Sequence, residues 1–103
     1  MDVQTAVETC AALATPSRLS VLKLLASAGK DGMPSGKIAE QLGVTQSTLS
    51  TQLFLLARAR LVRYKREKQS KIYSVNPDAI RDLIGFLIED CAGGRVKGVR
   101  INA

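Results

Sequence analysis

Apolar residues recur at intervals of three or four along most of the chain, which is the spacing of helices that bury one side. The first such segment covers residues 3–14 and carries Cys10 on its apolar side. The second covers residues 16–28 and follows Thr15-Pro16, since threonine caps helices and proline is tolerated at the first helical position. Its expected inward side includes Leu19, Leu22, Ala26 and their neighbours.

The same spacing predicts two further helices between residues 35 and 61, joined by a tight turn at Gly43. Glycine is the residue that most readily takes the left-handed conformation at a helix end. Thr45 then caps the second of these helices. Its expected inner side is Leu49, Leu53, Leu56 and Ala57. A helix, a short glycine turn and a second helix with polar groups at its start predict a helix-turn-helix.

After Leu61 the period of the pattern changes to two, which predicts strands over residues 61–67 and 71–75 with a hairpin turn between them. Asn76-Pro77 is expected to cap and restart a helix. The apolar side of this last helix is continuous. It consists of Ile80, Leu83, Ile84, Leu87, Ile88 and Cys91. Such a strong stripe on a terminal helix indicates an interface.

A chain of 103 residues with 46% apolar content is sufficient for one domain. The predicted fold is mainly α with a small β-hairpin wing, a winged helix-turn-helix over residues 1–92. Residues 93–103 are rich in glycine and basic residues, so we expect a flexible tail.

The net charge of +6 and the pI near 9.8 favour a polyanionic partner. The basic residues concentrate in the predicted hairpin and just before it. Those expected to contact the DNA backbone from the hairpin are Arg63, Lys65, Arg66, Lys68 and Lys71. Lys37, Thr45 and Thr48 are expected to contact phosphates beside them.

The second helix of the helix-turn-helix has the side chains needed to contact base edges in a major groove. These are Gln46, Ser47, Ser50 and Thr51. On an isolated helix, a face of this kind is usually only solvated. The order helix, glycine turn, helix and basic hairpin instead favours a double-stranded DNA partner.

Other classes of protein are disfavoured. The chain has no histidine, no glycine-rich phosphate loop and no nucleophile beside a base, so we expect no enzyme activity. Its longest apolar runs fall far short of the ~20 residues of a membrane helix. The N-terminal run MDVQTAVETCAALA lacks the basic region of a signal peptide, so a cytoplasmic protein that does not bind membranes is expected.

Three runs together resemble the ArsR family of winged helix-turn-helix repressors, over residues 13–87. They are LATPSRLSVLKLL, GKIAEQLGVTQSTLSTQL and LVRYKREKQSKIYSV. The resemblance implies a homodimer joined by the first and last helices, which binds an inverted repeat and is released by an inducer. The interface residues are then expected to be Val3, Val7, Ile80, Leu83, Ile84, Leu87 and Ile88.

The chain departs from the family pattern in ways that bear on function. Thr51-Gln52 replaces a common Arg-His pair, so the operator sequence does not carry over. Arg60 replaces a common glycine, at a cost of about 1 kcal/mol if the left-handed conformation is kept. The Cys-x-Cys metal motif and all histidines are absent, so no cofactor is required and a zinc site is not expected.

Cys10 and Cys91 leave three interpretations open. They can be buried for packing, as helical cysteines often are. As a pair of thiolates they suit a thiophilic inducer such as As(III) in an organoarsenical, or they can form a redox or polysulfide bridge. The predicted function is therefore an inducer-responsive repressor. The alternative is a constitutive or protein-regulated interaction module with structural cysteines.

Overall fold

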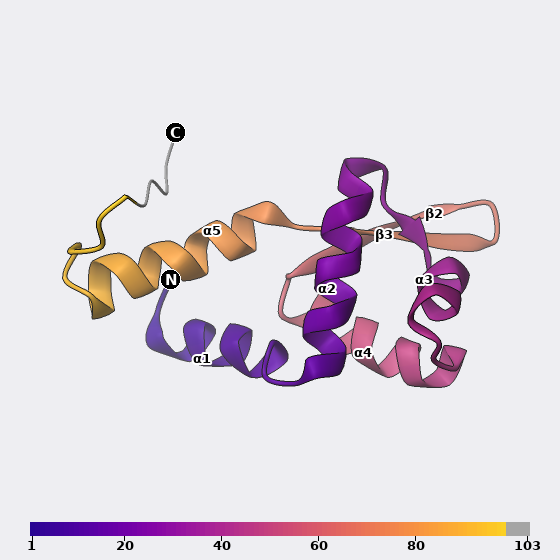
Figure 1. Ribbon diagram of the computed structural model, residues 1–103, viewed down its shortest axis with the longest axis horizontal. Helices are drawn as coiled ribbons and strands as arrows, with labels where there is room; N and C mark the ends of the chain where they lie inside the picture. The colour runs from indigo at the N-terminus through magenta and orange to yellow at the C-terminus, as the bar shows by residue number, and fades with distance from the viewer. Residues whose placement is uncertain (99–103) are drawn as a thin grey trace.

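In the computed structural model, which describes residues 1–98, four helices precede a β-hairpin and a fifth follows it (Figure 1). The elements in chain order are α1 (Val3–Ala12), α2 (Pro16–Ala28), the 3-10 turn η1 (Gly29–Asp31), β1 (Met33–Pro34), α3 (Ser35–Leu42), α4 (Gln46–Arg58), β2 (Val62–Glu67), β3 (Ser70–Val75), α5 (Pro77–Phe86) and the π-helical turn η2 (Leu87–Cys91). This order confirms the predicted winged helix-turn-helix.

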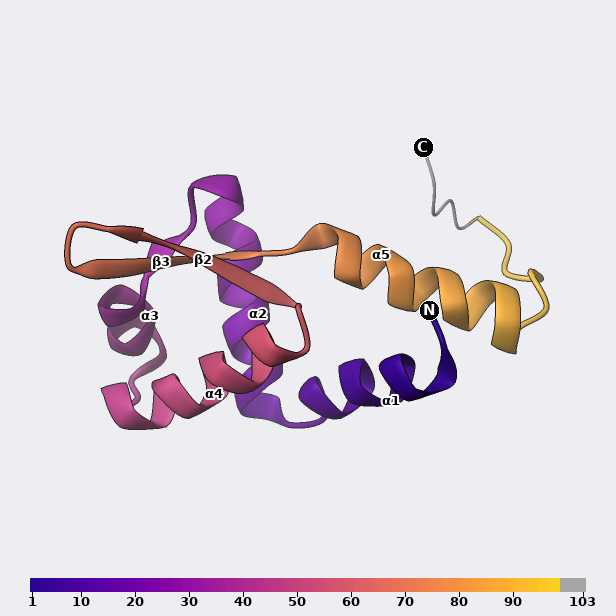
Figure 2. The ribbon, with the colours of Figure 1, turned by 180° about the vertical axis from the view of Figure 1, so that it is seen from behind.

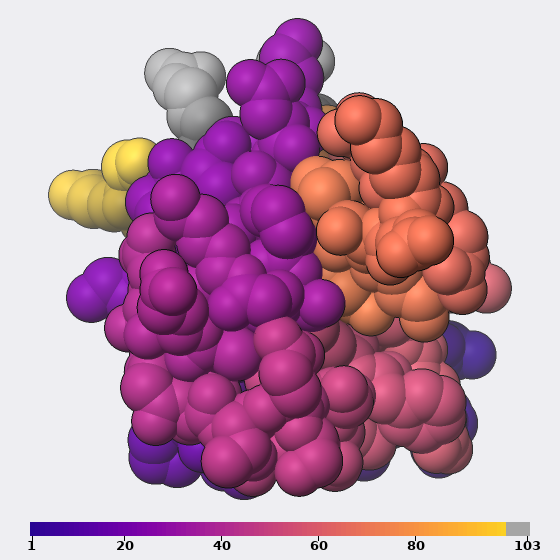
Figure 3. Space-filling view, turned by 90° about the vertical axis from the view of Figure 1, so that its right-hand side faces the viewer, coloured from indigo at the N-terminus to yellow at the C-terminus, as the bar shows by residue number. Residues whose placement is uncertain are grey.

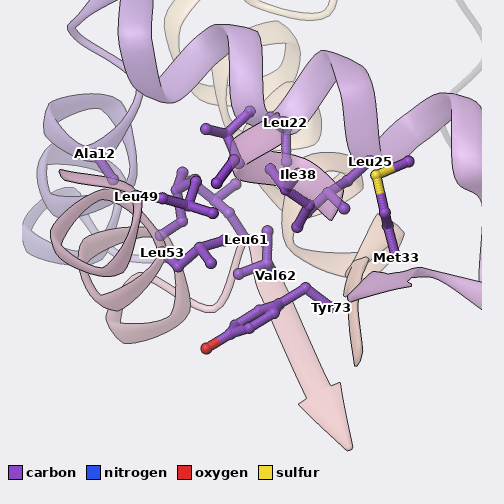
Figure 4. Packing of buried hydrophobic residues seen from close by; sticks show 13 residues of the cluster. Ala12, Leu22, Leu25, Met33, Ile38, Leu49, Leu53, Leu61, Val62 and Tyr73 are labelled. Carbon is purple, nitrogen blue, oxygen red and sulfur yellow. The ribbon is translucent and has the colours of Figure 1, made fainter. Parts of the chain in front are cut away.

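One side of α4 is part of the hydrophobic core (Figure 4). Leu49, Leu53 and Leu56 are almost completely buried there. They pack with Leu25 of α2 and Ile38 of α3, as the inner stripe of α4 predicts. Because these leucines occupy one side of the helix, the rotation of α4 about its own axis is fixed, and its polar side must face outward.

Two of the residues predicted to face inward in α2 are exposed, so the prediction is wrong at these positions. Leu19 is 52% exposed and Ala26 is also exposed, whereas Val21, Leu22 and Leu25 are buried. Apolar residues occur on more than one side of this helix, so spacing alone does not identify the buried one. The buried side of α2 is the one that packs against α4 and β3.

A third strand, β1, extends the predicted hairpin into a sheet with the order β1-β3-β2. Met33 pairs with Tyr73 and Pro34 with Ile72. Two residues are too few to show an alternating pattern, so the sequence does not reveal this strand. Gly32 precedes it with a φ of 75°, and a Cβ at this position would collide with the Tyr73 carbonyl oxygen. The close approach of the two chain segments therefore requires glycine.

The turns on either side of α4 take left-handed conformations. Gly43 has φ 68° and ψ 33°, which confirms its predicted role at the end of α3. Arg60 has a φ of 63°, so the position after α4 keeps the left-handed geometry without glycine. Asn76 lies at the N-cap position of α5 but makes no capping bond. Its side-chain amide instead donates to the Arg60 carbonyl oxygen over 2.9 Å.

Helices α1 and α5 form an arm that extends away from the helix-turn-helix (Figures 1 and 2). They run antiparallel, so that the start of α1 lies near the end of α5. The apolar stripe predicts a regular last helix up to Cys91, but the α-helix ends at Phe86 and continues as η2. Residues 93–98 belong to no helix or strand, and residues 99–103 of the predicted tail lie outside the described residues.

Replacing Arg60 with glycine should increase the free energy of unfolding by up to about 1 kcal/mol, because glycine takes a positive φ without steric cost. The bond from Asn76 ends on a backbone carbonyl and is retained in this variant. Urea unfolding followed by circular dichroism at fixed protein concentration measures the change. Arg58→Gly, at a normal helical position, is the matched control and should be destabilising by about 1 kcal/mol. Equal destabilisation by the two substitutions would contradict the interpretation that Arg60 is strained by its positive φ.

Candidate nucleic-acid interface

The outward side of α4 carries a stripe of small hydroxyl side chains. Ser47, Ser50 and Thr51 are all exposed, at the spacing that places them on one helix face. The helix start is capped as predicted, since the Thr45 hydroxyl accepts a bond from the Thr48 backbone N–H over 3.2 Å. The structure therefore brings these three exposed candidate residues together. Two of their hydroxyl groups already have partners, since that of Thr51 donates to the Ser47 carbonyl over 3.3 Å and that of Ser47 lies 3.4 Å from the Thr45 hydroxyl.

Gln46 and Thr48 lie on either side of this stripe rather than at its centre. Gln46 is exposed and lies close to Gly36 at the start of α3. A side chain introduced at Gly36 would place its β-carbon 3.5 Å from the side-chain amide nitrogen of Gln46. Thr48 lines a groove of about 270 Å³ that it shares with Ser17 and Ser20 of α2. Gln46 therefore borders Gly36 of α3, whereas Thr48 faces α2. Lys37, the residue after Gly36, is exposed.

The basic residues of the hairpin divide between its two faces, because side chains alternate along a strand. Arg66 and Lys71 are paired across the strands and share a face with Val62 and Tyr73, which pack on the helices. Arg63 and Lys65 lie on the opposite face. Lys68 lies in the turn with a φ of 59°. The basic side chains predicted to contact the DNA backbone therefore cannot all contact the same phosphates.

Aromatic rings organise the face that carries Arg66 and Lys71. The Lys71 ammonium lies 4.7 Å from the centre of the Tyr64 ring, and the Tyr64 and Tyr73 rings are 5.3 Å apart. Burial raises the pKa of Tyr73 above its usual value, which keeps its hydroxyl protonated. On the other face, Lys65 lies 3.8 Å from Glu67 in an exposed ion pair that contributes little to stability.

Helices α3 and α4 and the hairpin form one continuous face of the molecule. Figure 3 shows the magenta and pink surface of the two helices directly beside the orange surface of the hairpin. The hydroxyl stripe and the basic strands therefore lie on adjoining elements, as a DNA-binding face requires.

Arg18 connects α4 to α1, a contact that sequence reasoning missed. Its guanidinium donates to the Ala12 carbonyl over 2.6 Å and to the Ala11 carbonyl over 3.2 Å at the end of α1. It also donates to the Gln52 side-chain oxygen of α4 over 3.3 Å. A basic residue close after a helix end is the signal in the sequence, since the last carbonyls of a helix lack partners within it.

The predicted interface residues of the arm have different environments in the protomer. Val3, Val7, Ile84 and Leu87 are exposed, whereas Ile88 is half-buried. Leu83 is only 8% exposed and Ile80 packs against the main core, so these two residues already have contacts within the chain. In α1 the inward positions are the small residues Ala6, Thr9 and Ala12, which leaves the larger valines facing outward.

Cys10 and Cys91 are both exposed and carry free thiols. Cys10 lies near the end of α1 that joins α2, and Cys91 is the last residue of η2, at the far end of the arm. Since α1 and α5 run antiparallel, the two cysteines lie at opposite ends of the arm within one protomer (Figure 2). Among residues 1–98, no three Cys, Asp or Glu side chains are grouped so as to hold a metal ion.

Comparisons with known proteins agree with this fold. The model of a helix-turn-helix domain family matches residues 13–65. The nodulation protein NolR of Rhizobium meliloti is 35% identical over 86 residues, which cover 84% of this chain and 68% of that protein. The transcriptional repressor SdpR of Bacillus subtilis is 31% identical over 77 residues, which cover 75% and 82%. Within residues 1–98, no helix has the length and apolar character needed to cross a membrane.

Solved structures show the same fold. NolR from Sinorhizobium fredii superposes with a TM-score of 0.67 at 33% identity, over 84% of both chains. A homodimeric winged helix-turn-helix DNA-binding domain from Mycobacterium bovis superposes with a TM-score of 0.70 at 24% identity, over 98% of this chain and 90% of that one. The fold is also that of an ArsR-like transcriptional regulator from Rhodococcus sp. RHA1, with a TM-score of 0.77 at 19% identity over 88% of this chain and 83% of that one. The matched family model and the similarity to NolR and SdpR show that the chain belongs to a family of helix-turn-helix transcriptional regulators.

Proposed function

We propose that this protein is a cytoplasmic repressor that binds an inverted-repeat operator as a homodimer and leaves it when an inducer binds. The observation that carries this proposal is that α4, with its exposed hydroxyl stripe, and the basic hairpin are adjoining elements on one side of the molecule. Hydroxyl groups in the major groove contact base edges, while arginine and lysine side chains contact the flanking phosphates. The repressor SdpR is a relative of the same family.

The homodimer is supported by the apolar side chains that the arm leaves exposed. Val3 and Val7 of α1, Ile84 of α5 and Leu87 of η2 lie on stripes where burial against a second copy would remove them from water. A two-fold dimer also places two copies of α4 on one side of the DNA. Half-sites one helical turn apart require a separation of about 34–36 Å between them.

The inducer site is proposed at the cysteines, between protomers. Cys10 follows Val3 and Val7 on the exposed stripe of α1, and Cys91 follows Ile84 and Leu87 along the last helix. Because the two thiols lie at opposite ends of the arm in one chain, an arsenical bound by two thiolates needs cysteines from both protomers. Oxidation to a disulfide or polysulfide bridge has the same requirement. In either case the ligand would change how the two copies of α4 are held.

Base contact by α4 is tested with a DNA duplex selected from a random pool by the intact protein. Gln46→Ala should lower the ratio of specific to non-specific affinity by about tenfold, the value of one good base contact. Fluorescence anisotropy titrations against the selected and a scrambled duplex measure this ratio. Gln41→Ala, an exposed glutamine of α3, is the matched control and should leave it unchanged. An unaltered ratio for Gln46→Ala would remove this residue from base recognition.

Phosphate contact by the hairpin is tested through the dependence of affinity on salt. Arg66→Gln should weaken binding to all sequences and flatten the slope of log affinity against log salt by about one for each phosphate that the side chain neutralises. Arg63→Gln removes the same charge from the opposite face and should change the slope less. If Arg66→Gln leaves the slope unchanged, this face of the hairpin does not contact DNA.

The inducer proposal is tested with Cys91→Ser. Arsenite, methylarsenite or polysulfide should release the unaltered protein from its operator, while the variant should stay bound, because a hydroxyl does not replace a soft thiolate ligand. Anisotropy of labelled operator during inducer titration measures release. Both proteins should bind equally without inducer. Equal release by every reagent would exclude Cys91 from sensing and leave it as an interface residue.

A further inference from the structure

Phe54 is an exposed aromatic residue on the outward side of α4. Its exposed fraction is 62%, and its neighbours Leu53 and Leu56 are buried. It lies three residues after Thr51 and four after Ser50, so the hydroxyl stripe continues directly into the phenyl ring. Within α4 (Gln46–Arg58), Phe54 is the one exposed large apolar side chain.

The Phe54 ring lies outside the packed core of residues 1–98. Phe54 belongs neither to the core cluster nor to the partly buried residues packed against it. The groove of about 360 Å³ between α1 and α4 is lined on the α4 side by Leu55, Arg58 and Ala59. Phe54 therefore points away from both the core and the arm, toward the side of α4 that carries Ser47 and Ser50.

The spacing of the stripe fits a helix lying along a major groove. Ser47, Ser50, Thr51 and Phe54 occupy positions i, i+3, i+4 and i+7. Homeodomain recognition helices contact bases with residues at this same spacing. If α4 docks in this way, the side chain at the fourth position of the series reaches the groove floor together with the three hydroxyl groups.

The chemistry of the groove limits what a phenyl ring can recognise there. Base edges in the major groove present hydrogen-bond donors and acceptors, and the C5-methyl group of thymine is their apolar feature. We infer that Phe54 is a specificity-determining residue that contacts a thymine methyl in each half-site. This inference rests on the proposed function and adds a base preference that the hydroxyl groups do not provide, since serine and threonine bond to several bases.

The inference is tested by removing the methyl group alone. In the duplex selected by the intact protein, each thymine of a half-site is replaced in turn by deoxyuridine, which pairs identically but lacks the methyl. Replacement at one position should lower the affinity of the intact protein about fourfold, which corresponds to the burial of one methyl group. In Phe54→Ala the affinity should be lower and the methyl dependence at that position should disappear.

Leu19→Ala is the control, since it removes an exposed apolar side chain from α2 and should preserve the dependence on the methyl group. If Phe54→Ala does not give the circular dichroism of the folded protein, Phe54→Gln replaces it in the same comparison. A selected half-site without a methyl-sensitive thymine, or equal sensitivity with and without the ring, overturns the inference. Failure of the protein to select any sequence would instead overturn the proposed function.

Discussion

The burial of the leucine side of α4 is the constraint on which the functional surface depends. Leu49, Leu53 and Leu56 are held by α2 and α3 in the core, so the helix cannot rotate without exposing them. Large-to-small changes at such positions cost about 2–5 kcal/mol, a substantial fraction of the stability of a small domain. The polar side of α4 is therefore presented in a fixed orientation, which reduces the ordering required when it meets DNA.

The order of elements and the two turns around α4 were predictable because each has a local cause. Thr45 caps its helix and Gly43 takes the left-handed conformation. Features that depend on distant contacts were not predictable. Leu19 is exposed because α2 buries another side, and β1 forms because Met33 lies beside Tyr73. Of the candidate site, the residue types came from the sequence, but the division of hairpin charges between two faces required the strand register.

Within residues 1–98, hydrogen bonds made by the side chains of Arg18 and Asn76 join the arm to the helix-turn-helix. Arg18 links the end of α1 to Gln52 of α4, and Asn76 links the start of α5 to the carbonyl of Arg60, just after α4. Each connection ends on or beside the helix proposed to contact DNA. A movement of the arm would therefore be transmitted to α4 at two points, at Gln52 in the middle of the helix and at Arg60 just after its end.

The opposed faces of the hairpin also have a kinetic consequence. Charges that touch no phosphate still contribute to the electrostatic field of the protein, which accelerates encounter with a polyanion at low ionic strength. At physiological salt this field falls off over about 8 Å, so exposed charges on a protruding hairpin act before any short-range contact forms. If Arg66 and Lys71 make the phosphate contacts, Arg63 and Lys65 on the opposite face would influence how fast the protein finds DNA, separately from how long it stays there.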